Sequence, residues 1–171
     1  MSRPEAERAR EPELEIRLAT PDDSQVISDL IYAAFEPFKS EYTDGAFEYT
    51  TPTADMIHPR FDEGPIWLAV RDDEIVGTVS GLPDGERFYI RSMAIKPAVQ
   101  RDGLGQRLLE ALESYAREKG FEKLYLYTTF VLPGAKRLYE KNGFYVLRET
   151  QPEEWFDMGG LEMEKKLDGI K

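Results

Sequence analysis

The sequence predicts an α/β fold in which a central sheet of seven strands is flanked by four helices. Its 171 residues, with 41% hydrophobic and 12% aromatic side chains, suffice for one sizeable core and argue against a disordered chain. Apolar residues recur with a period of two in some segments and with a helical period in others. These segments alternate along the chain, which is typical of a sheet joined by crossovers and covered by helices.

The N-terminal part begins with a charged, proline-broken stretch at residues 1–13, for which we expect a mobile tail. Residues 14–171 are expected to form one domain. The alternating pattern of residues 14–18 predicts a half-buried strand. Residues 20–23, Thr-Pro-Asp-Asp, combine a capping hydroxyl, an early proline and two acids, which is helix-start chemistry, and the first helix should extend to about Phe35.

The middle of the chain is less regular. Residues 36–64 mix aromatic and acidic side chains, and we expect a second helix only over about 53–61. Three strands joined by short polar turns follow, at residues 65–72, 74–82 and 87–95.

The C-terminal part returns to clear patterns. A leucine-rich helical face starts at Leu104, and Gly120 stands where a C-terminal cap belongs. The remaining predicted elements are a strand at 124–128, a helix at 133–141 and two strands at 144–149 and 160–167.

Composition excludes several functions. With 22 basic and 33 acidic residues the net charge is −11, which argues against general nucleic-acid binding and against docking on anionic membranes. No cysteine and one histidine leave no basis for a disulfide, a thiolate or multi-histidine metal site, or a cysteinyl intermediate. No apolar run approaches a membrane span, and the N-terminus lacks the apolar core of a secretory signal. We therefore expect a cytoplasmic enzyme or binding protein without a metal.

The most informative segment is the turn between the strand at 87–95 and the long helix. Gly103 and Gly105 open that helix. Unpaired N–H groups at a helix start can hold a pyrophosphate, and glycine lets the main chain approach the anion. The spacing matches neither a dinucleotide fingerprint nor a P-loop, so an ordinary strand-to-helix turn is the alternative.

Two motifs in this region resemble those of the Gcn5-related N-acetyltransferase (GNAT) family. The first is Gln100-x-x-Gly103-x-Gly105 after Ile95-x-Pro97, and the second is Ala135-x-x-Leu138-Tyr139-x-x-x-Gly143-Phe144. Their separation and the order of elements also match the family, over about residues 14–167. The resemblance implies a GNAT-like mixed, mostly antiparallel sheet of about seven strands with about four helices.

The resemblance further implies acetyl-CoA as the co-substrate. Backbone amides from Arg101, Asp102, Gly103, Leu104, Gly105 and Gln106 would wrap the pyrophosphate of coenzyme A. Main-chain groups of Met93, Ala94 and Ile95 would pair with the pantetheine arm like an added strand. Residues 96–141 carry nine basic and six acidic side chains in a chain of net charge −11. That local excess suits an anionic ligand, although a solvated helix surface would show it as well.

Tyr139 matches the family's tyrosine that protonates the leaving sulfur, and a phenol is a suitable donor to a thiolate. The alternative is that its ring only packs beside Leu138. The general base stays open. Many relatives use a glutamate where this chain has Tyr89, Glu86 lies just upstream, and His58 is a further candidate.

The acceptor site is expected where residues 36–61 meet the last strands, because these segments combine aromatic rings with acids, which suit a cationic amine. The alternative is that the rings are core and the acids are solvated. The rings are Phe35, Phe38, Tyr42, Phe47, Tyr49, Trp155 and Phe156, and the acids are Glu36, Asp44, Glu48, Glu153, Glu154 and Asp157.

Three functions follow from these patterns. The first is an acetyl-CoA-dependent N-acetyltransferase that acetylates a primary amine of a small molecule or a protein by direct attack. The second is a non-catalytic acyl-CoA-binding or sensing module, which Leu132 favours because many relatives have a pantetheine-binding asparagine there. A phosphate-ligand enzyme of another kind is disfavoured, since no Walker-type lysine follows the glycines. The resemblance also allows a homodimer and leaves the acceptor and the acyl length open.

Overall fold

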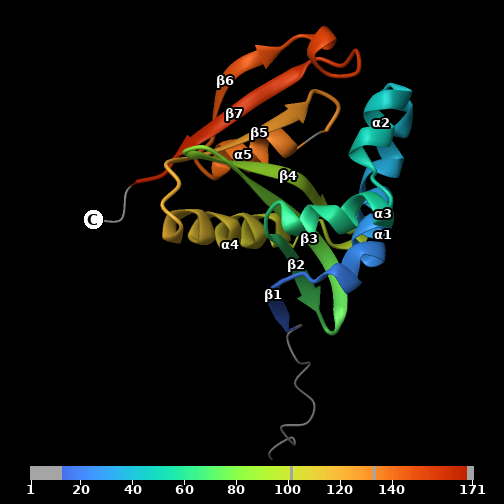
Figure 1. Cartoon of the computed structure of the whole chain (residues 1–171). Coiled ribbons are helices and arrows are strands. Elements are labelled where there is room, and N and C mark those ends of the chain that lie inside the picture. Colours follow the sequence, from blue (N-terminus) through green and yellow to red (C-terminus); the bar gives the residue numbers. More distant parts are fainter. Residues whose placement is uncertain (1–12, 101, 133, 169–171) are drawn as a thin grey trace, which may run out of the picture.

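The computed structural model describes residues 13–100, 102–132 and 134–168, and the predicted tail at 1–13 lies outside them except for Glu13. Their strands form one seven-stranded sheet in the order β1-β2-β3-β4-β5-β7-β6 (Figure 1). Neighbouring strands are antiparallel except for β4 and β5, which are parallel. This confirms the predicted mixed, mostly antiparallel α/β fold. The strands are β1 (Leu14–Leu18), β2 (Ile66–Arg71), β3 (Glu74–Asp84), β4 (Arg87–Ile95), β5 (Lys123–Thr129), β6 (Tyr145–Thr150) and β7 (Gly160–Lys166).

The described residues contain five α-helices, one more than predicted. The additional helix is α2, in which the Thr43 hydroxyl accepts a hydrogen bond from the Ala46 N–H and so caps the first turn. The helix expected over 53–61 is split into α3 and a 3₁₀ helix, His58–Asp62, because Pro59 offers no N–H to continue the α-helical ladder. The helices are α1 (Ser24–Phe35), α2 (Asp44–Thr50), α3 (Ala54–Ile57), α4 (Leu104–Glu118) and α5 (Ala135–Lys141).

The helices cover both faces of the sheet. Successive residues of a strand point to opposite faces. On β2, Trp67 and Ala69 join the core cluster that contains α4, whereas Ile66 and Leu68 join the cluster that contains α1. Figure 1 accordingly shows α4 and α1 on different sides of the strands.

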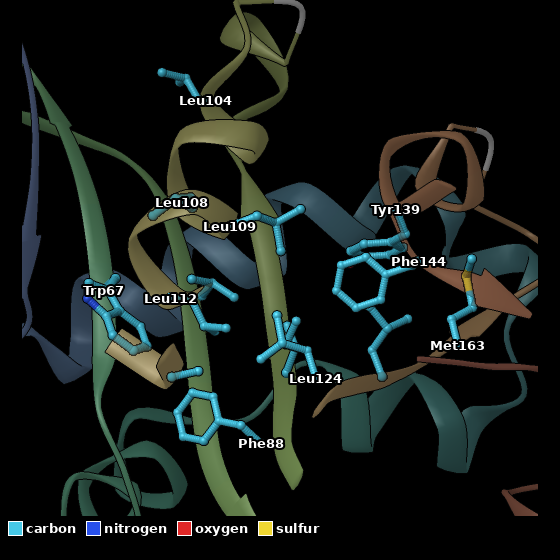
Figure 2. Packing of buried hydrophobic residues seen from close by; sticks show 14 of the residues in the cluster. Trp67, Phe88, Leu104, Leu108, Leu109, Leu112, Leu124, Tyr139, Phe144 and Met163 are labelled. Atoms are coloured by element: carbon cyan, nitrogen blue, oxygen red, sulfur yellow. The ribbon is translucent and has the colours of Figure 1, made fainter. Parts of the chain in front are cut away.

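The larger core lies between α4 and the sheet and continues to α5. The apolar face of α4 places Leu108, Leu109 and Leu112 in one buried cluster with Phe88 of β4 (Figure 2). Tyr139 and Phe144 extend the same cluster, which therefore anchors α5 beside the centre of the sheet. The leucine periodicity seen in the sequence thus fixes the position of both helices that carry the two motifs.

The parallel pair β4 and β5 separates partway along its length. Only Arg87–Tyr89 of β4 pair with Lys123–Tyr125 of β5, although β4 continues to Ile95 and β5 to Thr129. Beyond Tyr89, the β5-facing edge of β4 consequently has no neighbouring strand. The sheet is open at its centre, and this opening forms the candidate site.

The β4 strand also contains a bulge that the sequence pattern did not predict. Thr78 pairs with Ala94 and Ser80 with Arg91, so two residues of β4 stand opposite one of β3. Ser92, one of these two residues, has a φ of 56°, in the left-handed region that a non-glycine residue seldom adopts. The bulge reorients the side chains of β4 at the opening.

Candidate active site

A cavity of about 800 Å³ lies in the opening between β4 and β5. Its walls come from β4, β5, the starts of α4 and α5, the aromatic segment around α2 and the loop after β6. The cavity therefore brings together the two sequence motifs and the predicted acceptor segments. Its lining includes Phe35, Phe38, Tyr42, Tyr49, Arg60, Tyr89, Arg91, Met93, Ile95, Gly103, Gly105, Gln106, Leu132, Tyr139, Lys141, Arg148, Glu154 and Trp155.

Most residues that the sequence assigned to the cofactor line this cavity: Met93, Ile95, Gly103, Gly105 and Gln106, and Tyr139 lies with them. Three others direct their side chains elsewhere. Ala94 and Leu104 are buried in the core, and Asp102 forms an ion pair of 2.6 Å with Arg71. Because the expected roles use the main chain, these side-chain positions do not conflict with them. Arg101 lies outside the described residues.

The start of α4 has the features of an anion-binding helix end. Gly103 occupies the N-cap position with a φ of 74°, and no side chain caps the helix there. A Cβ on Gly103 would meet no atom of the described residues within 4 Å, so the space beside this residue is open among them. A Cβ on Gly105 would instead stand 3.1 Å from Leu138 Cδ2. The second glycine thus serves the close packing of α4 on α5, and the first leaves the space for a ligand.

The free edge of β4 supplies a second binding feature. From Ile90 to Ile95 the strand pairs with β3 on one side only, so backbone groups face the cavity without a strand partner. An extended chain can add to such an edge by main-chain hydrogen bonds. This edge and the α4 N-terminus are the two features that the sequence analysis expected to hold coenzyme A.

Tyr139 packs in the core and also lines the cavity. Its ring packs edge-on against Phe144, with 5.7 Å between ring centroids, and belongs to the core cluster (Figure 2). The same side chain lines the cavity and is 8% exposed. Burial raises the pKa of the Tyr139 phenol well above its ordinary value, and the neighbouring Tyr89 acts in the same direction. The phenol therefore keeps its proton over the physiological pH range.

The candidate general bases are not confirmed by their positions. Glu86 and His58 are exposed, and neither is among the described residues that line the cavity. Tyr89 does line it, but burial, followed by the charge of Tyr49, raises its pKa to about 12, which makes its phenolate scarce at neutral pH. The acid that lines the cavity among the described residues is Glu154, which Arg148 binds at 2.9 Å.

The predicted aromatic segments meet as expected at one end of the cavity. Tyr49 packs on Trp155 with 6.0 Å between ring centroids, which joins α2 to the loop after β6. The Thr43 hydroxyl donates a 2.6 Å hydrogen bond to the Phe156 carbonyl across the same contact. Two segments far apart in sequence therefore meet at this end of the cavity, and Figure 1 shows α2 and the loop after β6 on the same side of the molecule.

The expected acidic lining of this end is wrong. The charged residues lining the cavity, within the part of the chain that the structure describes, are Arg60, Arg91, Lys141, Arg148 and Glu154. The other acids named in the sequence are exposed to solvent: Glu36, Asp44, Glu48, Glu153 and Asp157. In these short helices and turns the rings pack inward and the acids point outward, so the overall negative charge does not describe the cavity.

Arg60 and Arg91 were missed by the sequence analysis. Strand alternation alone places Arg91 on the face of Tyr89, and both line the cavity. Arg60 gives no comparable signal, because it follows Pro59 in a segment without a regular period. Its Nη1 donates a 3.1 Å hydrogen bond to the hydroxyl of Ser92 at the β4 bulge.

Comparison with known proteins places this geometry in a family. The model of the acetyltransferase (GNAT) family matches residues 27–144. This match covers more than half of the chain, so the chain belongs to the GNAT family. The family defines the fold and the acetyltransferase class.

Individual relatives are more distant. The chain is 32% identical to the "probable N-acetyltransferase 14" of Xenopus tropicalis over 103 residues, which cover 57% of this chain and 50% of that protein. It is 28% identical to the "uncharacterized N-acetyltransferase YjgM" of Escherichia coli K12 over 107 residues, covering 59% of this chain and 64% of that one. The chain thus matches about half to two thirds of the length of these curated relatives.

Solved structures share the fold. The PaiA N-acetyltransferase of Thermoplasma acidophilum, solved in complex with coenzyme A, superposes with a TM-score of 0.78 at 18% identity, covering 91% of this chain and 99% of that one. An acetyltransferase of the GNAT family from Staphylococcus aureus gives a TM-score of 0.73 at 18% identity. Separately, no helix within residues 13–100, 102–132 and 134–168 is both long and apolar enough to cross a membrane.

Proposed function

We propose that this protein transfers the acetyl group of acetyl-CoA to a primary amine by direct attack, with Tyr139 as the general acid. The observation that carries this proposal is the single cavity that joins the open N-terminus of α4, the free edge of β4 and Tyr139. Family membership supports the same class of reaction.

Acetyl-CoA supplies the thioester, and this chain supplies the means to hold it. The first N–H groups of α4, around Gly103, would bind the pyrophosphate, because they carry partial positive charge and no side chain caps them. The β4 edge from Met93 to Ile95 would bind the pantetheine arm by main-chain hydrogen bonds. Both contacts use backbone groups, which explains why the side chains of Ala94 and Leu104 are free to pack in the core.

In the transfer step, the lone pair of a neutral amine nitrogen attacks the thioester carbonyl carbon. The new C–N bond forms, the C–S bond breaks, and the amide product and coenzyme A thiol result. Tyr139 donates its proton to the departing sulfur and recovers one that the amine nitrogen releases through water. The chain has no cysteine, so the acyl group cannot pass through a cysteinyl enzyme intermediate.

The buried state of Tyr139 suits this role. Burial raises the pKa of the phenol, so the acid form is present whenever the amine is deprotonated enough to attack. Glu154 is the carboxylate among the described lining residues, and it forms an ion pair with Arg148. The amine is therefore expected to enter as the free base or to lose its proton to water.

The test is Tyr139→Phe, which removes the hydroxyl and retains the ring that packs on Phe144. Tyr32→Phe on α1 is the matched control, since it removes a hydroxyl from an exposed side chain that is not among the described cavity residues. Release of coenzyme A thiol gives kcat, and calorimetry gives the Kd of coenzyme A. We expect kcat of Tyr139→Phe to fall by about 10²- to 10⁴-fold with an unchanged Kd.

Two results would contradict the proposal in different ways. An unchanged kcat in Tyr139→Phe with a good acceptor would reduce Tyr139 to a packing residue. Tight binding of acetyl-CoA by the unmodified protein without thiol release for any amine would instead identify a non-catalytic acyl-CoA-binding module.

A further inference from the structure

The acceptor end of the cavity contains two arginines, of which only one is paired with a described carboxylate. Arg91 Nη2 binds Glu63 at 2.9 Å, and its side chain is only 15% exposed. No carboxylate of the described residues forms an ion pair with Arg60, whose side chain donates to the uncharged Ser92 hydroxyl. This corner of the cavity therefore has an uncompensated positive charge.

A second observation shows that the corner is short of hydrogen-bond acceptors. Arg91 Nε is buried without a hydrogen-bond partner among the described residues. A buried N–H of a charged group without a partner is costly, and native structures seldom contain one unless a ligand or water binds there. Burial, followed by the charge of Arg91, lowers the pKa of Arg60. An anion bound by both guanidinium groups would accept a hydrogen bond from Arg91 Nε and would reduce the repulsion between the two positive charges.

The other charges around the cavity do not supply that anion. Glu154 is bound by Arg148, which also lies 3.5 Å from Glu162. Glu63 is the partner of Arg91 and is not among the described cavity residues. Lys141 adds a further positive charge at the exposed end of α5. The lining thus favours an anionic ligand group, in contrast to the acidic surface of the chain as a whole.

The position of the pair relates the anion to the acceptor. Arg60 is held at the Ser92 bulge of β4, and Arg91 belongs to the same strand. Both arginines line the cavity that Tyr139 also lines. The α4 N-terminus, with Gly103, is the separate feature that suits the coenzyme's pyrophosphate.

We propose that Arg60 and Arg91 bind the carboxylate of the acceptor, and that the acceptor is a small amino-carboxylic acid whose amine is acetylated. Planar guanidinium groups match a carboxylate with paired hydrogen bonds. A cavity of about 800 Å³, which would also hold the pantetheine arm, has room for a small molecule. This inference rests on the proposed acetyl transfer and names its acceptor class.

The experiment uses the full chain, acetyl-CoA and the twenty amino acids, each paired with its carboxamide. The carboxamide keeps the size and removes the negative charge; because it also lowers the pKa of the amine, kcat/KM is compared per concentration of free base. We expect at least one amino acid to exceed its carboxamide by about 10-fold or more in kcat/KM. In Arg60→Gln this preference should fall by about 10- to 100-fold, because one charge-assisted contact is lost, while the Kd of coenzyme A stays unchanged.

Lys119→Gln is the control, since it removes one positive charge from the exposed end of α4, outside the described cavity lining. It should leave the preference intact. Equal kcat/KM for every acid and its carboxamide would overturn the inference while leaving acetyl transfer standing. A loss of coenzyme A affinity in Arg60→Gln, with no change in preference, would overturn it by assigning the arginines to the cofactor phosphates.

A binding measurement separates this inference from the transfer reaction. Calorimetry in the presence of coenzyme A compares each N-acetyl amino acid with its N-acetyl carboxamide. Preferential binding of the acid that disappears in Arg60→Gln would support the carboxylate site even if no thiol were released. Equal binding of the two forms would overturn the site whether or not the protein is an acetyltransferase.

Discussion

Gly103 and Gly120 form a natural pair for testing the pyrophosphate site, because they share a backbone conformation and differ in position. Gly103 caps the start of α4 with a φ of 74°, and Gly120 follows the end of α4 with a φ of 83°. A Cβ on either residue would meet nothing within 4 Å. Gly103→Ala and Gly120→Ala therefore impose similar backbone strain without a steric clash, and only Gly103 faces the proposed ligand.

The expected cost in stability is the same for both substitutions. A left-handed conformation costs a non-glycine residue about 1–2 kcal/mol. For a chain of this length, each kcal/mol corresponds to about 2–4 °C in Tm, so both variants should melt about 2–8 °C lower than the unmodified protein. Gly120 N donates to the Arg117 carbonyl at 3.1 Å, and alanine retains this hydrogen bond.

The expected effect on binding differs between the two. A methyl group at Gly103 occupies the space in front of the first amides of α4 and costs at least one hydrogen bond to a charged phosphate, worth about 1.5–3 kcal/mol. The Kd of coenzyme A should rise by about 10- to 100-fold in Gly103→Ala and remain unchanged in Gly120→Ala. Calorimetry gives the Kd of coenzyme A, and thermal melts give Tm, for the unmodified protein and the two variants. Equal Kd values for both variants, each folded, would refute the assignment of the pyrophosphate to this helix end.

Two further predictions concern the core and the pH profile. Gly81→Ala should destabilise the protein by about 1–3 kcal/mol or more, since the new Cβ would overlap Cζ of the fully buried Phe88. Urea unfolding measures the free energy of unfolding of both proteins. A difference of less than about 0.5 kcal/mol would show that the Phe88 ring can move aside. The kcat/KM for an amine should rise with pH as the amine loses its proton. It should show no decrease up to about pH 9.5, because the raised pKa of Tyr139 keeps the general acid protonated over that range. A decrease in kcat/KM near pH 8 that is absent in Tyr139→Phe would contradict the raised pKa.

The sequence was sufficient for the parts of the fold that rest on local periodicity. Strands were predicted at all seven positions, from alternation at residues 14–18 and from runs between polar turns in the following meander, and the leucine face starting at Leu104 located α4. Gly103 and Tyr139 could be assigned to the candidate site because each lies in a motif whose spacing fixes its place at a helix start or on a helix. These features depend on neighbours a few positions away, which the sequence displays directly.

The segment at 36–64 shows where local patterns fail. Its helix α2 spans only seven residues, Asp44–Thr50, which is too short for a helical period to stand out. It is held in place by contacts with the loop after β6, including the hydrogen bond from Thr43 to Phe156, 113 positions away. Such stabilisation comes from tertiary packing, which cannot be predicted from local helix propensity.

What the sequence by itself determined is therefore the seven strands, the helices other than α2, the two motifs and the residues that carry them. Only the tertiary structure decided the charge of the cavity, since the same segments hold acids that point to solvent and Arg60, which the 3₁₀ helix His58–Asp62 directs into the cavity. The β4 bulge at Ser92 likewise depends on pairing with β3. Side-chain direction in short helices and bulged strands is set by what packs against them, so a net charge of −11 coexists with a cavity lined mainly by basic groups.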